Sequence, residues 1–129
     1  DGGYISDNIC YAYNGNGGLG AIPFARCCSI IGGAQCIDES ETLIDPADDT
    51  LIDIYCPADY ELTGCTVQSY EKRFDGILPY DNYCQLHSST TTVTGYARCC
   101  KPSDASNTLS CNTVSAISTG LTASVSCES

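Results

Sequence analysis

The sequence predicts an all-β fold held together by disulfides, and three observations support this prediction. Eleven cysteines occur in 129 residues, which is about the density of disulfide scaffolds in secreted chains. Short segments alternate apolar and polar residues with a period of two, the pattern of half-buried strands. Methionine and tryptophan are absent and phenylalanine is rare, so the chain cannot build a large aromatic core and depends on covalent cross-links.

Three segments are expected to form strands. Residues 50–56 and 121–127 alternate along their length, so one face of each strand points into a core. Residues 90–100 are rich in β-branched and aromatic side chains, which favour strands. The inward-facing residues are expected to be Ile52, Ile54, Cys56, Ala123, Val125 and Cys127.

Turns are expected where glycine, asparagine or proline interrupts these segments. They fall at residues 14–18, 31–33, 75–76 and 101–102. No segment has the periodicity of an amphipathic helix. Short strands between turns predict a small sandwich or barrel.

Part of the sequence is repeated, which predicts a modular architecture. Aspartate, glycine, aspartate, asparagine and cysteine recur in the same order at residues 1–10 and 75–84, and Ala-Arg-Cys-Cys follows at 25–28 and 97–100. The chain is therefore expected to begin partway through one module, complete a second and stop within a third. The expected parts are residues 1–28, 29–102 and 103–129.

The complete module contains six cysteines: Cys36, Cys56, Cys65, Cys84, Cys99 and Cys100. Adjacent cysteines such as Cys99 and Cys100 rarely bond to each other, because the short ring strains the disulfide. On a strand they point to opposite faces, so each needs its own distant partner. Six cysteines can pair in many ways, and the residues alone do not choose among them.

Four strings of this module carry a resemblance to a known family: Cys56-Pro57, Leu62-Thr63-Gly64-Cys65-Thr66, Asp81-Asn82-Tyr83-Cys84 and Ala97-Arg98-Cys99-Cys100. They resemble the resistin-like cysteine-rich modules of the C-terminal domain of proprotein convertase subtilisin/kexin type nine and of the resistin head. The resemblance covers about residues 36–100, with fragments at 1–28 and 111–127. It implies small antiparallel β-sandwich (jelly-roll-like) modules with nested disulfides: Cys36–Cys100, Cys56–Cys99 and Cys65–Cys84.

The chain departs from this family in two respects. The convertase domain is histidine-rich, whereas this sequence contains one histidine, and the convertase's protease domain is missing. The resemblance therefore brings neither histidine-dependent pH behaviour nor catalysis.

The two ends together resemble one further module that lacks its third cysteine. Cys111 and Cys127 correspond to the first and second cysteines, and Cys10, Cys27 and Cys28 to the fourth, fifth and sixth. The family's nested pairing then implies Cys28–Cys111 and Cys27–Cys127. It leaves Cys10 as a free thiol or an intermolecular cysteine.

Three arrangements of these ends remain open. The ends of one chain can close on each other, or the tail of one molecule can complete the head of the next. Alternatively, the chain is a piece of a longer tandem array whose next residues supply the missing cysteine. A head-to-tail contact grows into a filament unless it closes into a ring.

Composition excludes two classes of partner. The net charge of −11 argues against nucleic acid, because phosphate contacts need a basic face. No apolar run approaches the length of a membrane span, so no membrane insertion is expected. The first ten residues are polar and hold no apolar core, which is typical of a mature form rather than of a signal peptide. A secreted, extracellular location is expected.

No catalytic site, metal site or cofactor is expected. His87 is the only histidine, and no nucleophile-elbow motif accompanies it. No Cys-x-x-Cys pair is present to bind zinc. The acidic residues of 38–53 lack the EF-hand pattern, so a solvated loop is favoured over a calcium site. The nine tyrosines suit interfaces, but we expect them mainly to cover a thin core.

These features predict a non-enzymatic extracellular structural protein. It would self-associate, head to tail or through disulfides, into a fibre or matrix. The alternative is a soluble secreted module that binds an extracellular protein, such as a receptor.

Overall fold

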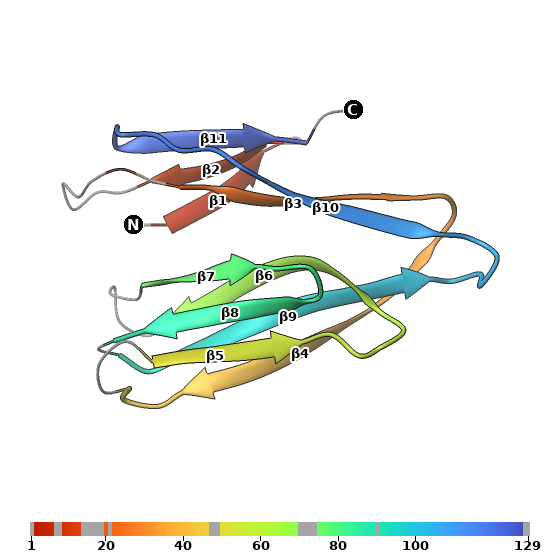
Figure 1. Cartoon of the computed structure of the whole chain (residues 1–129), viewed down its shortest axis with the longest axis horizontal. Helices are drawn as coiled ribbons and strands as arrows, with labels where there is room; N and C mark the ends of the chain where they lie inside the picture. The colour runs from red at the N-terminus through yellow and green to blue at the C-terminus, as the bar shows by residue number, and fades with distance from the viewer. Residues whose placement is uncertain are drawn as a thin grey trace. The chain divides into compact units, whose positions relative to one another are not determined.

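The computed structural model describes residues 2–6, 9–13, 20, 22–46, 50–69, 75–89 and 91–127. The chain divides into two compact units. Cys28–Cys111 form the complete unit, and Asp1–Cys27 with Asn112–Ser129 form the terminal unit. The strands (Figure 1) are β1 (Gly2–Ser6), β2 (Ile9–Tyr13), β3 (Phe24–Ile30), β4 (Ala34–Leu43), β5 (Thr50–Tyr55), β6 (Glu61–Ser69), β7 (Gly76–Pro79), β8 (Tyr83–Ser88), β9 (Val93–Pro102), β10 (Leu109–Ser115) and β11 (Thr122–Ser126).

The complete unit is a sandwich of two antiparallel sheets (Figure 1). One sheet has the strand order β4-β9-β6 and the other β5-β8-β7. The chain changes sheet after β4, β5, β6 and β8, and only β7 and β8 are consecutive strands of one sheet. The prediction of an all-β, disulfide-rich antiparallel sandwich is confirmed.

The core of the complete unit lies between these sheets. Strand β8 alternates regularly, with Cys84, Leu86 and Ser88 buried and the residues between them half-buried. Leu62 of β6 and Leu86 are fully buried. The remaining buried members of the cluster are Leu43, Ile54, Cys56, Val93, Ala97 and Cys99. The inward orientation predicted for Ile54 and Cys56 is confirmed.

Three disulfides reinforce this sandwich. Cys56–Cys99 and Cys65–Cys84 join one sheet to the other, with Cα–Cα distances of 5.5 and 5.9 Å. Cys36–Cys100 joins directly opposed residues of β4 and β9, with Cα atoms 4.1 Å apart. The adjacent Cys99 and Cys100 thus take different partners, because neighbouring side chains of a strand point to opposite faces. These are the pairs that the resemblance implies.

The terminal unit contains the sheet β1-β2-β11, and β3 pairs with β10 as a two-stranded ribbon. The Cys27–Cys127 disulfide lies within this unit, whereas Cys28–Cys111 joins the two strands of the ribbon at the boundary. These pairs also match those that the resemblance implies. The ends of a single chain therefore close on each other here. Of its described residues, Pro23, Ala25 and Ala123 are buried.

Two details differ from the sequence-based expectations. Strand β9 does not turn at residues 101–102 but continues to Pro102, which pairs with Ala34. Proline is tolerated at this position because β6 pairs with β9 only as far as Cys100, so Pro102 has a neighbouring strand on one side only and lies at an edge of the sheet. The turn follows, where the Asp104 carboxylate accepts hydrogen bonds from the N–H and hydroxyl of Ser106. The boundary of the complete unit lies after Cys111 rather than at residue 102.

The turn predicted at residues 31–33 is present, and Gly32 has the left-handed φ of 89° that favours glycine. The turn predicted at residues 14–18 lies outside the described residues. Within the described ranges, no helical segment has the length and hydropathy of a membrane span.

Candidate functional site

The candidate site lies in the strands of the two chain ends, which repeat five of the six strands β4 to β9. Strands β10, β11, β1, β2 and β3 correspond to β4, β5, β7, β8 and β9. The registers agree as well: Cys10 lies opposite Val125 in the pair β2–β11, and Cys84 lies opposite Ile54 in the pair β8–β5. Cys10 and Cys84 therefore occupy the same position in two copies of one architecture.

Two of the three disulfides of the complete unit have a counterpart among the disulfides of the chain ends. The Cα–Cα distance is 5.4 Å in Cys27–Cys127 and 5.5 Å in the corresponding Cys56–Cys99. It is 4.1 Å in Cys28–Cys111 and also in Cys36–Cys100. The correspondence thus holds for the disulfide positions as well as for the strand registers.

One strand of the complete unit has no counterpart among the described strands of the chain ends. Strand β9 lies between β4 and β6, whereas among the described residues β3 pairs with β10 alone. The strand without a counterpart is β6, which carries Leu62 and Cys65. The edge of β3 that corresponds to the β6 side of β9 is therefore open in the described part of the chain. We call this side of β3 the open edge, because no described strand pairs with it.

Cys10, Cys27 and Cys28 are more exposed than their counterparts Cys84, Cys99 and Cys100. Cys84 and Cys99 are fully buried, but the corresponding Cys10 and Cys27 are half-buried. Cys100 is 6% exposed and therefore buried, whereas Cys28 is exposed. In the complete unit β6 contributes to this burial, because Leu62 lies opposite Cys99 and Cys65 bonds Cys84. The terminal unit has no described strand in that position.

Cys10 is the free cysteine of the chain, and the other ten form disulfides. Its counterpart Cys84 is bonded to Cys65 of β6, the strand for which the described residues show no counterpart. Thiol–disulfide exchange requires access to the attacking sulfur, and a half-buried thiol provides partial access. Counting the cysteines identifies Cys10, but only the strand pairing shows that it occupies the position of Cys84.

A second feature is a cluster of tyrosines on the complete unit. The Tyr83 ring stacks on Tyr80 at 4.7 Å and is tilted against Tyr55 at 4.8 Å. Tyr55 is 60% exposed and Tyr80 40%. The expectation that the tyrosines mainly cover the core is therefore wrong for this cluster. Tyr60, by contrast, packs against the core with Lys101 over its ring.

The cluster alters the titration of its central member. Desolvation raises the pKa of the Tyr83 hydroxyl above its ordinary value, and the nearby Asp53 carboxylate adds to the increase. Tyr55, Tyr80 and Asp81 contribute in the same direction. Asp53 itself accepts hydrogen bonds from Gln85 Nε2 at 2.9 Å and from the Tyr55 hydroxyl at 3.4 Å.

The residues weighed for catalysis or metal binding are dispersed. His87 is half-buried in β8, opposite Leu51 of β5. In the acidic stretch, Asp38 forms an ion pair with Arg98 at 2.7 Å, and Asp45 accepts a hydrogen bond from Thr92 at 3.1 Å. Asp48 and Asp49 lie outside the described residues. The described side chains contain no group of three or more potential metal ligands.

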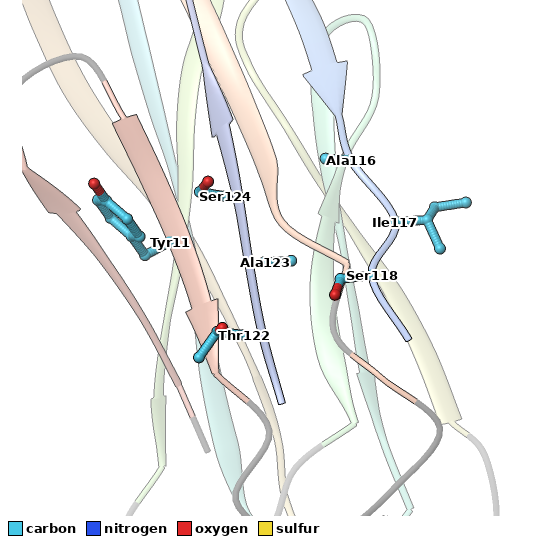
Figure 2. A pocket seen from close by; sticks show the side chains of 7 residues that line it. All are labelled: Tyr11, Ala116, Ile117, Ser118, Thr122, Ala123 and Ser124. Atoms are coloured by element: carbon cyan, nitrogen blue, oxygen red, sulfur yellow. The ribbon is translucent and has the colours of Figure 1, made fainter. Parts of the chain in front are cut away.

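A shallow depression of about 330 Å³ lies in the terminal unit (Figure 2). Its lining residues are Tyr11, Ala116, Ile117, Ser118, Thr122, Ala123 and Ser124. Figure 2 shows these side chains spread on both sides of β11, without converging on one point. The lining includes no carboxylate, histidine or cysteine, so it offers no acid–base pair.

Five disulfides within one chain are typical of proteins that mature in an oxidising, extracellular environment. No family model, curated protein or solved structure matches this chain.

Proposed function

We propose that the protein is a non-enzymatic extracellular structural protein that assembles with further copies into a fibre or matrix. The observation that carries this proposal is the free thiol of Cys10 in a terminal unit whose described strands include no counterpart of β6. Unpaired strand edges favour association, and natural proteins usually cover or interrupt them. An odd cysteine in an otherwise fully oxidised chain points in the same direction.

Extended assembly needs two different contacts for each chain. A disulfide through Cys10 links two molecules only, because each chain carries a single free thiol. Growth beyond a pair requires that residues 112–129 of one chain complete residues 1–27 of the next. The Cys27–Cys127 disulfide would then join two chains while keeping the contacts found within one, as in domain swapping.

Isotope mixing tests this exchange. Equal amounts of ¹⁵N-labelled and unlabelled chains are refolded together under oxidising conditions, and the Cys27–Cys127 peptide pair is analysed by mass spectrometry. Exchange between chains gives disulfides with one labelled and one unlabelled partner. The Cys36–Cys100 pair of the complete unit serves as the internal control and should stay unmixed. If both pairs stay unmixed, the ends close within each chain and head-to-tail growth is rejected.

The role of Cys10 is tested separately. Wild type and Cys10→Ser are compared by non-reducing electrophoresis and size-exclusion chromatography, and filaments are sought by electron microscopy. We expect wild type to form covalent pairs and larger species, and Cys10→Ser to lose the Cys10-linked pairs. A single wild-type species at 13.6 kDa with no filaments contradicts the assembly function.

A second candidate function is that of a secreted protein-binding module, and the tyrosine cluster favours it. Tyrosine is enriched at protein interfaces, because its ring is apolar and its hydroxyl is polar. Tyr55 and Tyr80 are exposed beside Tyr83 on the sheet β5-β8-β7. A monomeric wild type whose pull-down of an extracellular protein is lost in Tyr55→Ser/Tyr80→Ser would support this candidate over assembly.

A further inference from the structure

We propose that the outer face of the sheet β5-β8-β7 binds a basic segment of another extracellular protein, with an arginine that contacts both the Tyr55 ring and the Asp53 carboxylate. This role rests on the second candidate function, names the chemistry of its partner and does not require assembly. Three properties of the face support it: its exposed apolar side chains, the stacking of its tyrosines and the charge beside them.

The apolar side chains gather on one face of the complete unit. In β8, Cys84 and Leu86 point into the core, so Gln85 between them points outward. Asp53 of β5 and Leu78 of β7 lie opposite Gln85 and share this outer face. The exposed apolar side chains of the face are those of Leu51, Tyr55, Leu78 and Tyr80.

The outer face of the other sheet, β4-β9-β6, is polar. Across β4 and β9 it pairs Thr42 with Thr94 and Asp38 with Arg98, through a hydrogen bond of 2.9 Å and an ion pair of 2.7 Å. Among the described residues of this face, no large apolar side chain is exposed. Exposed apolar groups that concentrate on one face among polar residues are typical of an interaction surface.

The tyrosines of the sheet β5-β8-β7 form a stack with exposed ends. The Tyr83 ring centroid lies 4.8 Å from that of Tyr55, in β5, and 4.7 Å from that of Tyr80, which directly follows β7. Since β5 and β7 flank β8, the Tyr83 ring lies between the other two, which remain exposed. A planar cation can extend such a stack, because the face of an aromatic ring carries negative potential.

A carboxylate lies beside the Tyr55 end of the stack. Asp53 Oδ2 accepts a hydrogen bond from the Tyr55 hydroxyl at 3.4 Å, and Oδ1 accepts one from Gln85 Nε2 at 2.9 Å. Both donors are uncharged, and an ionised carboxylate can accept further hydrogen bonds. One guanidinium group can therefore contact the ring and the carboxylate together, since arginine combines a planar, stacking surface with several N–H donors.

The arginine and lysine that the structure describes in the complete unit have other contacts. Arg98 pairs with Asp38, and Lys101 Nζ lies 4.7 Å from the centroid of the Tyr60 ring. Both cations belong to β9, in the sheet β4-β9-β6. The contact between Lys101 and Tyr60 shows that a tyrosine of this unit already binds a cation over its ring.

Charge favours a basic partner over a second copy of the chain. The net charge is −11, and residues 28–111 contain 13 of the 16 aspartates and glutamates. Desolvation raises the pKa of Tyr83 most, and the charges of Asp53 and Asp81 raise it further, so negative charge acts on the stack itself. Two copies that met through this face would bring like charges together, whereas a basic segment would be attracted to it.

Peptide binding to the intact oxidised chain tests this role. The probe is a short fluorescent peptide in which arginine alternates with threonine, so that its arginines share one side when it is extended. Two control peptides carry lysine or uncharged citrulline in place of arginine. At physiological ionic strength, we expect fluorescence anisotropy to show about fivefold tighter binding of the arginine peptide than of the lysine peptide, and the weakest binding for citrulline.

Substitutions in the chain test where the peptide binds. We expect Tyr55→Ser and Asp53→Asn each to weaken binding of the arginine peptide by about fivefold or more. The matched controls are Tyr96→Ser, in the sheet β4-β9-β6, and Asp59→Asn, in an exposed turn, and each should change binding by less than about twofold. In the wild-type complex, the largest changes of amide chemical shift should fall in β5 and β8.

The outcomes separate this role from the second candidate function. Absence of binding, equal binding of the arginine and lysine peptides, or binding that Tyr55→Ser and Asp53→Asn leave unchanged would overturn the proposal. If the pull-down of an extracellular protein depends on Tyr55 and Tyr80 but the arginine peptide does not bind, the second candidate function stands and the basic partner is rejected. If neither is observed, both are rejected, and the assembly assays, which contain no peptide, are unaffected.

Discussion

Cys27 and Cys127 lie 100 residues apart in sequence, yet a disulfide with a Cα–Cα distance of 5.4 Å joins them. The neighbouring Cys28–Cys111 disulfide already closes a loop that spans 83 of these 100 residues. With it in place, Cys27–Cys127 closes an effective loop of only about 20 residues, which corresponds to on the order of 3 kcal/mol of stabilisation. Because Cys27–Cys127 is nested around Cys28–Cys111, its contribution to the free energy of unfolding is about that of a disulfide between residues close in sequence.

Removal of this disulfide should destabilise the terminal unit selectively. In Cys27→Ser/Cys127→Ser, we expect amide exchange to accelerate in β1, β2 and β11, because few buried apolar residues support that unit. Exchange in β8 and β9 should change little. The matched control is Cys65→Ser/Cys84→Ser, whose loop is similarly short and which should affect the complete unit instead. Equal acceleration in both units would contradict the independence of the two cores.

Leu62 should be the most sensitive apolar position of β6. It is fully buried in the core of the complete unit. We expect Leu62→Ala to lower the free energy of unfolding by about 2–5 kcal/mol, since it removes buried methyl groups and leaves a cavity. Leu51→Ala, at a position 55% exposed, is the control and should cost much less. Urea denaturation measures both, and similar losses would show that Leu62 is not part of a tightly packed core.

At Gly95 of β9, side chains of the facing sheet approach the backbone closely. A Cβ at this position would lie 2.7 Å from the Ile54 Cδ1 and 3.2 Å from side-chain atoms of Ile77 and Leu86. We expect Gly95→Val to destabilise the unit by about 1–3 kcal/mol or more through overpacking. Gly64→Ala, with open space around its Cβ, should be tolerated. A neutral Gly95→Val in the same denaturation assay would mean that the sheets can separate at little cost.

Several features of the fold follow from local sequence. The alternation of residues 50–56 predicts β5 and the burial of Ile54, because a strand places every second side chain on one face. Counting cysteines against the repeat singles out Cys10 as the odd one. Both inferences depend only on residues that are close in sequence or on the composition of the chain.

The open edge and the tyrosine cluster could not be predicted in this way, since both depend on long-range strand pairing. The open edge is recognised only by comparison: β6, which lies between β5 and β7 in the sequence, pairs with the distant β9, and no described strand pairs with β3 in the corresponding position. In the cluster, Tyr80 and Tyr83 meet locally in the turn between β7 and β8, where the Tyr80 N–H donates to the Tyr83 carbonyl, whereas the long-range pairing of β5 with β8 brings Tyr55 to Tyr83. The continuation of β9 to Pro102 likewise reflects its pairing with Ala34 and overrides the local turn preference.

Titration at alkaline pH should reveal the environment of Tyr83. Its pKa is raised by desolvation first and by the Asp53 charge second, so the fold favours the protonated phenol. This contribution to stability is complete below the ordinary tyrosine pKa of about 10 and is lost as the pH rises through the higher pKa of the folded state. Midpoints of urea denaturation should therefore fall over that alkaline range.

Asp53→Asn tests the electrostatic part of this effect. The substitution removes the charge but keeps an oxygen that can accept the Gln85 hydrogen bond. We expect the pKa of Tyr83 to fall toward its ordinary value, measured as tyrosinate absorbance against a Tyr83→Phe reference. Asp59→Asn removes an equal charge from an exposed turn outside the groups that raise this pKa, and it should leave the titration unchanged. If Tyr83 has the same pKa in both variants, the net charge of the protein rather than the adjacent Asp53 carboxylate acts on its hydroxyl. The position of Asp53 beside Tyr83 would then have no effect on this pKa.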